Sequence, residues 1–239
     1  MEQKKILAWG VHLYTGLGLV LSAGMAVLLV HGGENAFRLT FALMFIATVI
    51  DTTDGWLARK ARVWEVLPGF DGRRLDDLID FNTYTTLPLL LIWRAGLLSG
   101  DNQWWLLLPL LASAYGFCQT NAKTDDHFFV GFPSYWNITA FYLYLLQPPE
   151  WATLALIITL ALLTFVPVRY LYTTHGGRLS LVTNLFGAAW ALSLLLIFLQ
   201  WGHVPLPYIL VTLSFPIWYT AMSWIISIRY WRDKALARS

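Results

Sequence analysis

Long apolar runs separated by short polar breaks dominate the pattern along this chain. Several runs approach 20 residues, the length at which a helix crosses about 30 Å of hydrocarbon. The pattern predicts eight membrane-spanning helices, over residues 9–30, 37–58, 75–98, 104–121, 132–147, 151–172, 181–200 and 205–229. The fifth span is short, and the number falls to seven if it forms one bent helix with its neighbour. The expected fold class is an all-α, polytopic membrane helical bundle, forming one integral membrane domain over residues 1–239.

Composition excludes several other classes of protein. Apolar residues make up 57% of the chain and charged residues only 13%, against about 25% charged residues in soluble domains. A soluble enzyme with so few charges could not cover its own surface. The lone Cys118 cannot form an internal disulfide, and a net charge of +2 is too small to predict a nucleic-acid partner.

Basic residues are distributed asymmetrically between the predicted loops. With eight spans, 14 of the 16 Lys and Arg residues fall on one side, and only Arg38 and Arg94 fall toward the other. Because loops rich in Lys and Arg stay in the cytoplasm, we expect both termini and the 59–74 loop to be cytoplasmic. An even number of spans follows from the same asymmetry.

Acidic residues gather in one short part of the chain. Seven of the 14 lie between Asp51 and Asp80, whereas residues 151–232 contain none. Asp51 and Asp54 end the second predicted span, and Asp76 and Asp80 begin the third. At about 100° per residue, each pair lies on one helical face, and the small residues Gly55 and Ala58 share the face of the first pair.

Two helices packed through these faces would bring up to four carboxylates together. Unpaired anions beside a bilayer cost several kcal/mol, and hard divalent cations that prefer carboxylate oxygens remove that cost. The spacing therefore predicts a Mg²⁺ or Mn²⁺ site at the cytoplasmic edge of the membrane. Solvated helix ends are the alternative, but they would not need to stack on two faces beside small residues.

The same residues resemble the signature of the CDP-alcohol phosphotransferase family. The resemblance rests on Asp51-x2-Asp54-Gly55-x2-Ala58-Arg59 followed by Gly72-x3-Asp76-x3-Asp80. It implies a six-helix core, with the last two spans peripheral. Twelve residues separate Arg59 from Gly72, a longer spacing than in most of the family, which resembles the bacterial members that use choline.

The resemblance implies a reaction and a role for each motif residue. The phosphatidyl group of CDP-diacylglycerol would pass to choline and CMP would leave. Asp51, Asp54 and Asp76 would hold two divalent ions, Mn²⁺ or Mg²⁺, and Asp80 would be the general base that also touches the second ion. Donor-binding roles are implied for Gly55, Ala58, Arg59 and Gly72.

The acceptor site is less marked in the sequence. A quaternary ammonium is recognised by aromatic faces, and the candidates are Tyr84, Tyr115, Tyr135 and Trp136. Tyr84 lies four residues after Asp80, on the same helical face. Inositol, serine and glycerol 3-phosphate stay open as acceptors, and Arg73, Arg74 and Lys123 would suit a phosphorylated one unless they are only cytoplasmic loop charge.

Two other functions fit parts of the pattern. Asp76-Asp77-x2-Asp80 matches the acidic motif of membrane prenyltransferases, but no later span carries the second acidic motif they need. A divalent-cation transporter would need acids along a pathway, and here they stay at one face. The expected location is the bacterial inner membrane, among membrane lipids and with a homodimer as a further expectation. The five histidines lack ligand spacing, so no role follows for them.

Overall fold

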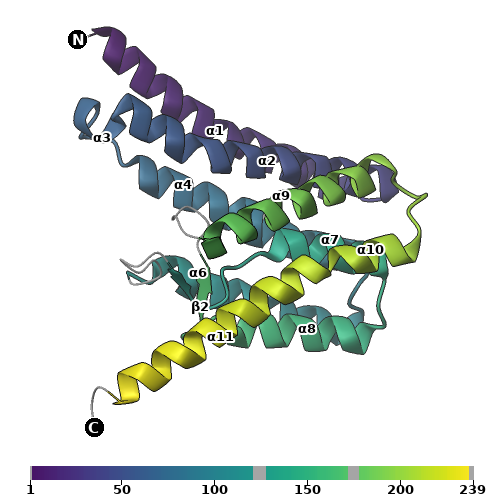
Figure 1. Cartoon of the computed structure of the whole chain (residues 1–239). Coiled ribbons are helices and arrows are strands. Elements are labelled where there is room, and N and C mark those ends of the chain that lie inside the picture. Colours follow the sequence, from purple (N-terminus) through teal and green to yellow (C-terminus); the bar gives the residue numbers. More distant parts are fainter. Residues whose placement is uncertain (1, 121–127, 172–177, 237–239) are drawn as a thin grey trace. The chain divides into compact units, whose positions relative to one another are not determined.

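The computed structural model describes residues 2–120, 128–171 and 178–236 (Figure 1). It divides into two compact units, one comprising Met1–Phe117 with Ser134–Ile158 and the other comprising Cys118–Pro133 with Thr159–Ser239. We call them the first unit and the second unit. Lys123 lies outside the described residues.

The first unit is built from helices. Its elements are α1 (Glu2–His31), α2 (Glu34–Ala61), α3 (Val63–Val66), α4 (Gly72–Asp80), the π-helix η1 (Phe81–Thr86), α5 (Leu87–Arg94), the 3₁₀ helix η2 (Gly100–Leu106), α6 (Leu107–Cys118), α7 (Trp136–Leu146) and the start of α8 (Glu150–Leu163). α4, η1 and α5 follow one another without a break and together form the third predicted span.

The second unit contains the rest of the helices and a short β-ribbon. Its elements are β1 (Phe128–Val130), the end of α8, β2 (Arg169–Leu171), α9 (Arg178–Leu199), α10 (Leu206–Thr212) and α11 (Ser214–Leu236). In the described part of the chain, each of the eight predicted spans corresponds to a helical segment, and four segments are long and apolar enough to cross a membrane. The all-α membrane class is confirmed.

The prediction of a helix over 151–172 is wrong in its last part. α8 ends at Leu163, and Arg169–Leu171 forms the strand β2 instead. Pro167 explains the change, because proline has no N–H to donate and disfavours helical geometry in the residue before it. β2 pairs antiparallel with β1, with Tyr170 opposite Phe129.

Side chains of α11 complete the hydrogen bonding of β2. The backbone N–H of Arg169 donates to Ser227 Oγ at 2.7 Å, and that of Leu171 donates to Ser223 Oγ at 3.4 Å. Tyr219 donates its hydroxyl proton to the carbonyl of Leu171 at 2.9 Å. An edge strand normally leaves such groups unpaired, so the serines of α11 take the place of a third strand.

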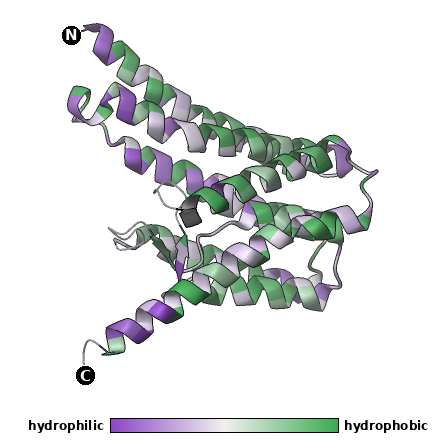
Figure 2. Ribbon diagram, viewed as in Figure 1, coloured by the Kyte–Doolittle hydropathy of each residue, from purple (hydrophilic) through white to green (hydrophobic). Residues whose placement is uncertain are grey.

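α1 and α2 form an antiparallel hairpin, seen side by side in Figure 1. Gly32 and Gly33 connect them with φ of 71° and 89°, values that glycine adopts without strain. Their middles are hydrophobic, whereas the start of α1 and the end of α2 are hydrophilic (Figure 2). α1 therefore begins at the same end of the hairpin at which the acidic part of α2 lies.

Polar contacts stabilise the first unit at the end that lies away from the acidic part of α2. Arg94, one of the two basic residues that depart from the charge asymmetry, donates from Nε to the carbonyl of Leu29 at 2.8 Å and from Nη2 to that of Val30 at 3.1 Å. It thus satisfies carbonyls that the end of α1 would otherwise leave unpaired. Hydrogen bonds from the backbone N–H of Ser99 and from the Asn102 side chain lower the pKa of the Glu150 carboxyl.

We expect the Arg94→Gln variant to unfold at a lower temperature than the wild type. Losing these hydrogen bonds costs about 1 kcal/mol, which corresponds to roughly 2–4 °C in Tm for a chain of this size. Thermal unfolding of the detergent-purified protein measures the shift. Arg73→Gln, which also removes an exposed arginine, is the matched control, and an equal Tm loss in both variants would contradict the capping role.

Candidate active site

Three of the four predicted carboxylates converge in the structure. Asp51 on α2 and Asp76 and Asp80 on α4 each place a carboxylate oxygen so that the three oxygens lie within 4.8 Å of one another. All three side chains are half-buried. We call these residues the acidic cluster. The convergence that the helical-face argument predicted is therefore present for three of the four carboxylates.

The fourth carboxylate, Asp54, lies at the edge of the acidic cluster. Its side chain interacts electrostatically with that of Asp76. It also accepts a hydrogen bond from the hydroxyl of Thr15 on α1, with 2.8 Å between Oγ1 and Oδ2. Asp54 is buried, with 6% of its surface exposed. α1 therefore supplies a polar partner to the motif that the sequence pattern did not reveal.

The start of α4 is fixed by its own sequence. Asp71 is the N-cap, and its carboxylate accepts a hydrogen bond from the backbone N–H of Arg74 at 3.0 Å. An acidic N-cap stabilises the first turn of a helix, where backbone N–H groups have no partner within the helix. Asp76 and Asp80 follow on the second and third turns of this capped helix.

Tyr84 contacts the acidic cluster through its hydroxyl. The hydroxyl donates to Asp51 Oδ2 at 2.7 Å, which joins η1 to α2. Tyr84 lies in a π-helix, where Thr86 Oγ1 also donates to the carbonyl of Phe81 five residues earlier. In this position Tyr84 orients a carboxylate, while its predicted role in choline recognition stays a prediction.

The other donor-site candidates lie on the last turns of α2 and the first of α4. Arg59 is exposed, and its guanidinium lies close to Gly55, where a Cβ atom would be 3.5 Å from Nη1. Ala58 is half-buried on the same helix. At Gly72 a Cβ would lie 2.5 Å from Cε1 of His12, so the imidazole fills the space of a side chain there.

The other three acceptor candidates lie on segments that contribute no residue to the acidic cluster. Tyr115 on α6 is exposed, and Tyr135 precedes α7 and is half-buried. Trp136 is completely buried, and its indole N–H donates to Ser113 Oγ at 2.8 Å. The choline roles of these three residues stay predictions.

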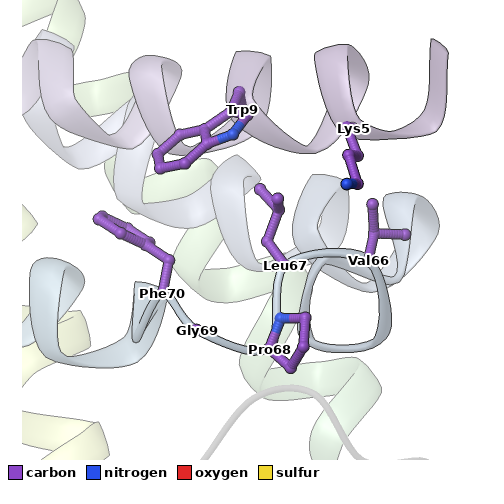
Figure 3. Close-up of a pocket in the computed structure, with 7 residues that line it drawn as sticks. All are labelled: Lys5, Trp9, Val66, Leu67, Pro68, Gly69 and Phe70. Atoms are coloured by element: carbon purple, nitrogen blue, oxygen red, sulfur yellow. The ribbon is translucent and has the colours of Figure 1, made fainter. Parts of the chain in front are cut away.

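A cleft opens beside the start of α1 (Figure 3). Its volume is about 310 Å³, and it is lined by Lys5, Trp9, Val66, Leu67, Pro68, Gly69 and Phe70. Trp9 and Phe70 meet edge to face, with their ring centroids 5.1 Å apart. The long 60–71 segment thus folds back against α1, next to the first turn of α4.

The donor set of the acidic cluster fits a hard divalent cation. Its ligands are carboxylate oxygens, which suit Mg²⁺ and Mn²⁺ better than softer metals. Carboxylates brought this close repel one another unless a cation or a proton compensates their charge.

Comparison with known proteins assigns the family. The CDP-alcohol phosphatidyltransferase family model matches residues 12–176, which include the whole motif, and the chain belongs to this family. A phosphatidylcholine synthase of Pseudomonas aeruginosa is 34% identical over 230 residues, covering 96% of this chain and 93% of that protein.

Two further relatives are also named phosphatidylcholine synthase. The phosphatidylcholine synthase of Legionella bozemanae is 34% identical, over 81% of this chain and 91% of its own. That of Borreliella burgdorferi is 33% identical, over 74% of this chain and 75% of its own. Family membership sets aside the prenyltransferase and the transporter.

We expect Tyr84→Phe to weaken divalent-metal binding about tenfold, because outer partners that orient ligands typically contribute 10- to 100-fold to metal affinity. Mn²⁺ titration followed by electron paramagnetic resonance measures the affinity directly. Tyr115→Phe removes a hydroxyl from α6 and is the matched control. Unchanged Mn²⁺ affinity in Tyr84→Phe would show that its hydrogen bond to Asp51 does not orient a ligand.

Proposed function

We propose that this chain transfers the phosphatidyl group of CDP-diacylglycerol to choline and releases CMP, forming phosphatidylcholine. The observation that carries the proposal is the convergence of Asp51, Asp76 and Asp80 within the family's motif. Choline as the acceptor is supported by relatives named phosphatidylcholine synthase. One of them aligns over 96% of this chain, well beyond the residues that the family model matches.

In this proposal the acidic cluster and Asp54 hold the metal. Asp51, Asp54, Asp76 and Asp80 would bind two divalent cations, Mn²⁺ or Mg²⁺. When bound, such ions neutralise charge on the diphosphate oxygens and so favour departure of CMP. Tyr84 holds Asp51 in place through its hydroxyl, and Thr15 does the same for Asp54.

Asp80 is the proposed general base. The choline oxygen forms a bond to the phosphorus that carries the diacylglycerol, and the bond from that phosphorus to the CMP oxygen breaks. The hydroxyl proton passes to the Asp80 carboxylate, which α4 holds one turn beyond Asp76. A positioned base of this kind typically contributes 10²–10⁴ to the rate.

The donor's nucleotide is assigned to the last turns of α2 and the first turn of α4. Gly55 and Ala58 leave room beside the acidic cluster, and the Arg59 guanidinium would contact a phosphate oxygen. Gly72 starts the facing helix at the same end. Tyr84, Tyr115, Tyr135 and Trp136 remain the candidates for contacts to choline.

We place the enzyme in the bacterial inner membrane, with both termini and the acidic cluster on the cytoplasmic side. The asymmetry of Lys and Arg supports this orientation. The acyl chains of the donor then stay in the bilayer, while choline arrives from the cytoplasm. Homodimer formation stays a prediction.

An acceptor panel tests the reaction. We expect purified protein with labelled CDP-diacylglycerol and Mn²⁺ to form one lipid product with choline and none with ethanolamine, inositol, serine or glycerol 3-phosphate. Chelation with EDTA should abolish the reaction, and added Mn²⁺ should restore it. A product with another alcohol only would overturn choline as the acceptor while leaving the family intact.

Asp80→Asn tests the general base. The amide cannot accept the hydroxyl proton, so we expect kcat to fall at least about 100-fold, with CMP binding retained. Asp77→Asn is the matched control, because Asp77 is the neighbouring acid on α4 and does not belong to the acidic cluster. Equal losses in the two variants would argue against a specific role for Asp80.

A further inference from the structure

His12 combines deep burial with a ring nitrogen that lacks a partner. Only 6% of its surface is exposed, and Nε2 makes no hydrogen bond within the described part of the chain. Buried polar atoms in folded proteins are nearly always paired, and an exception near a functional site calls for a ligand or water. The other such atoms among the described residues are hydroxyls of Thr85, Thr153 and Thr164.

The imidazole is held from several sides. The Phe70 ring lies 4.5 Å from it and the Trp9 ring 5.9 Å, measured between centroids. Across from it is Gly72, where an added Cβ would lie 2.9 Å from Nδ1 and 3.7 Å from Nε2. The ring is thus fixed between α1, the 60–71 segment and the first residue of α4.

This position is one helical turn from the acidic cluster. On α1, Thr15 follows His12 by three residues and binds Asp54. On α4, Asp76 follows Gly72 by four residues. At 1.5 Å per residue, the imidazole lies about 4.5–6 Å from the level of these carboxylates along the helices. That is the length scale of one phosphate or sugar unit of a nucleotide.

We propose that His12 binds the nucleotide half of the donor, with Nε2 hydrogen-bonded to a phosphate or ribose oxygen of the cytidine nucleotide. The inference rests on the CDP-linked donor of the proposed function and is independent of the acceptor alcohol. Choline is excluded as the partner, because a quaternary ammonium neither donates nor accepts hydrogen bonds. The choline hydroxyl belongs at Asp80, one turn further along α4.

The same contact gives Gly72 a second role. A side chain at residue 72 would push the imidazole out of its place between Phe70 and Trp9, so Gly72 keeps His12 in position toward the nucleotide. Glycine at this position then has two functions: it leaves space for the His12 ring, and it permits close approach of the donor.

Paired substitutions of His12 test the proposal, because the amide nitrogen of Gln superposes on Nε2 and that of Asn on Nδ1. We expect His12→Phe and His12→Asn to weaken CMP binding about tenfold, measured by equilibrium dialysis with Mn²⁺ present. His12→Gln should recover much of the loss. KM for CDP-diacylglycerol should rise in the same order, whereas KM for choline should stay unchanged.

His203→Phe is the matched control, since it removes an exposed imidazole elsewhere in the chain. Tm without nucleotide identifies a variant that fails to fold, and the Gln and Asn pair then decides the question. Equal CMP affinity in His12→Gln and His12→Asn, or a change confined to KM for choline, would overturn the proposal. If CMP binding depends on His12 but choline is not used, the inference stands and the proposed acceptor fails.

Gly72→Ala tests the contact between the two residues. We expect this change to weaken CMP binding strongly in the wild-type background, because the added methyl group meets the imidazole. In a His12→Ala background the further loss should be small, since the space is then open. Additive losses in the double variant would show that Gly72 acts independently of His12.

Discussion

The repulsion between carboxylates that α2 and α4 bring together is the constraint on which the rest of the first unit depends. Carboxylate oxygens of Asp51 on α2 and of Asp76 and Asp80 on α4 lie within 4.8 Å of one another. α1 holds the two helices in place, since it packs against both of them and binds Asp54 through Thr15. The binding free energy of a cation is thus coupled to the packing of three helices.

Much of the fold could be predicted because a segment that crosses the bilayer carries apolar side chains and must pair its backbone groups within itself, which favours a helix. The prediction of a span over 151–172 was wrong at its end, where the backbone of β2 is paired by groups from other elements. β2 is paired on one side by β1 and on the other by hydroxyls of α11, Ser223 and Ser227. No local pattern indicates that a distant helix will supply hydrogen-bonding groups to a short strand.

The candidate site, like the fold, could be predicted only in part from the sequence. The spacing of the aspartates fixed their faces, because residues three or four apart on a helix share a side. The contacts of Thr15 and His12 were missed because both are scattered polar residues in the mostly apolar helix α1, and the residues that they contact are remote in the sequence. The hydroxyl contact of Tyr84 with Asp51 was also out of reach, since ideal helical periodicity does not describe the π-helix that carries it.

The π-helix η1 makes the chain sensitive to length at one point. A π-turn accommodates one more residue than the α-helix around it. Deleting a single residue within Phe81–Thr86 would let the segment relax to regular α-helix without altering the apolar character of the span. The segment would still cross the membrane, but the Tyr84 phenol that now reaches α2 would be rotated to another face. The loss of one residue would therefore disrupt the acidic cluster without disturbing insertion into the bilayer.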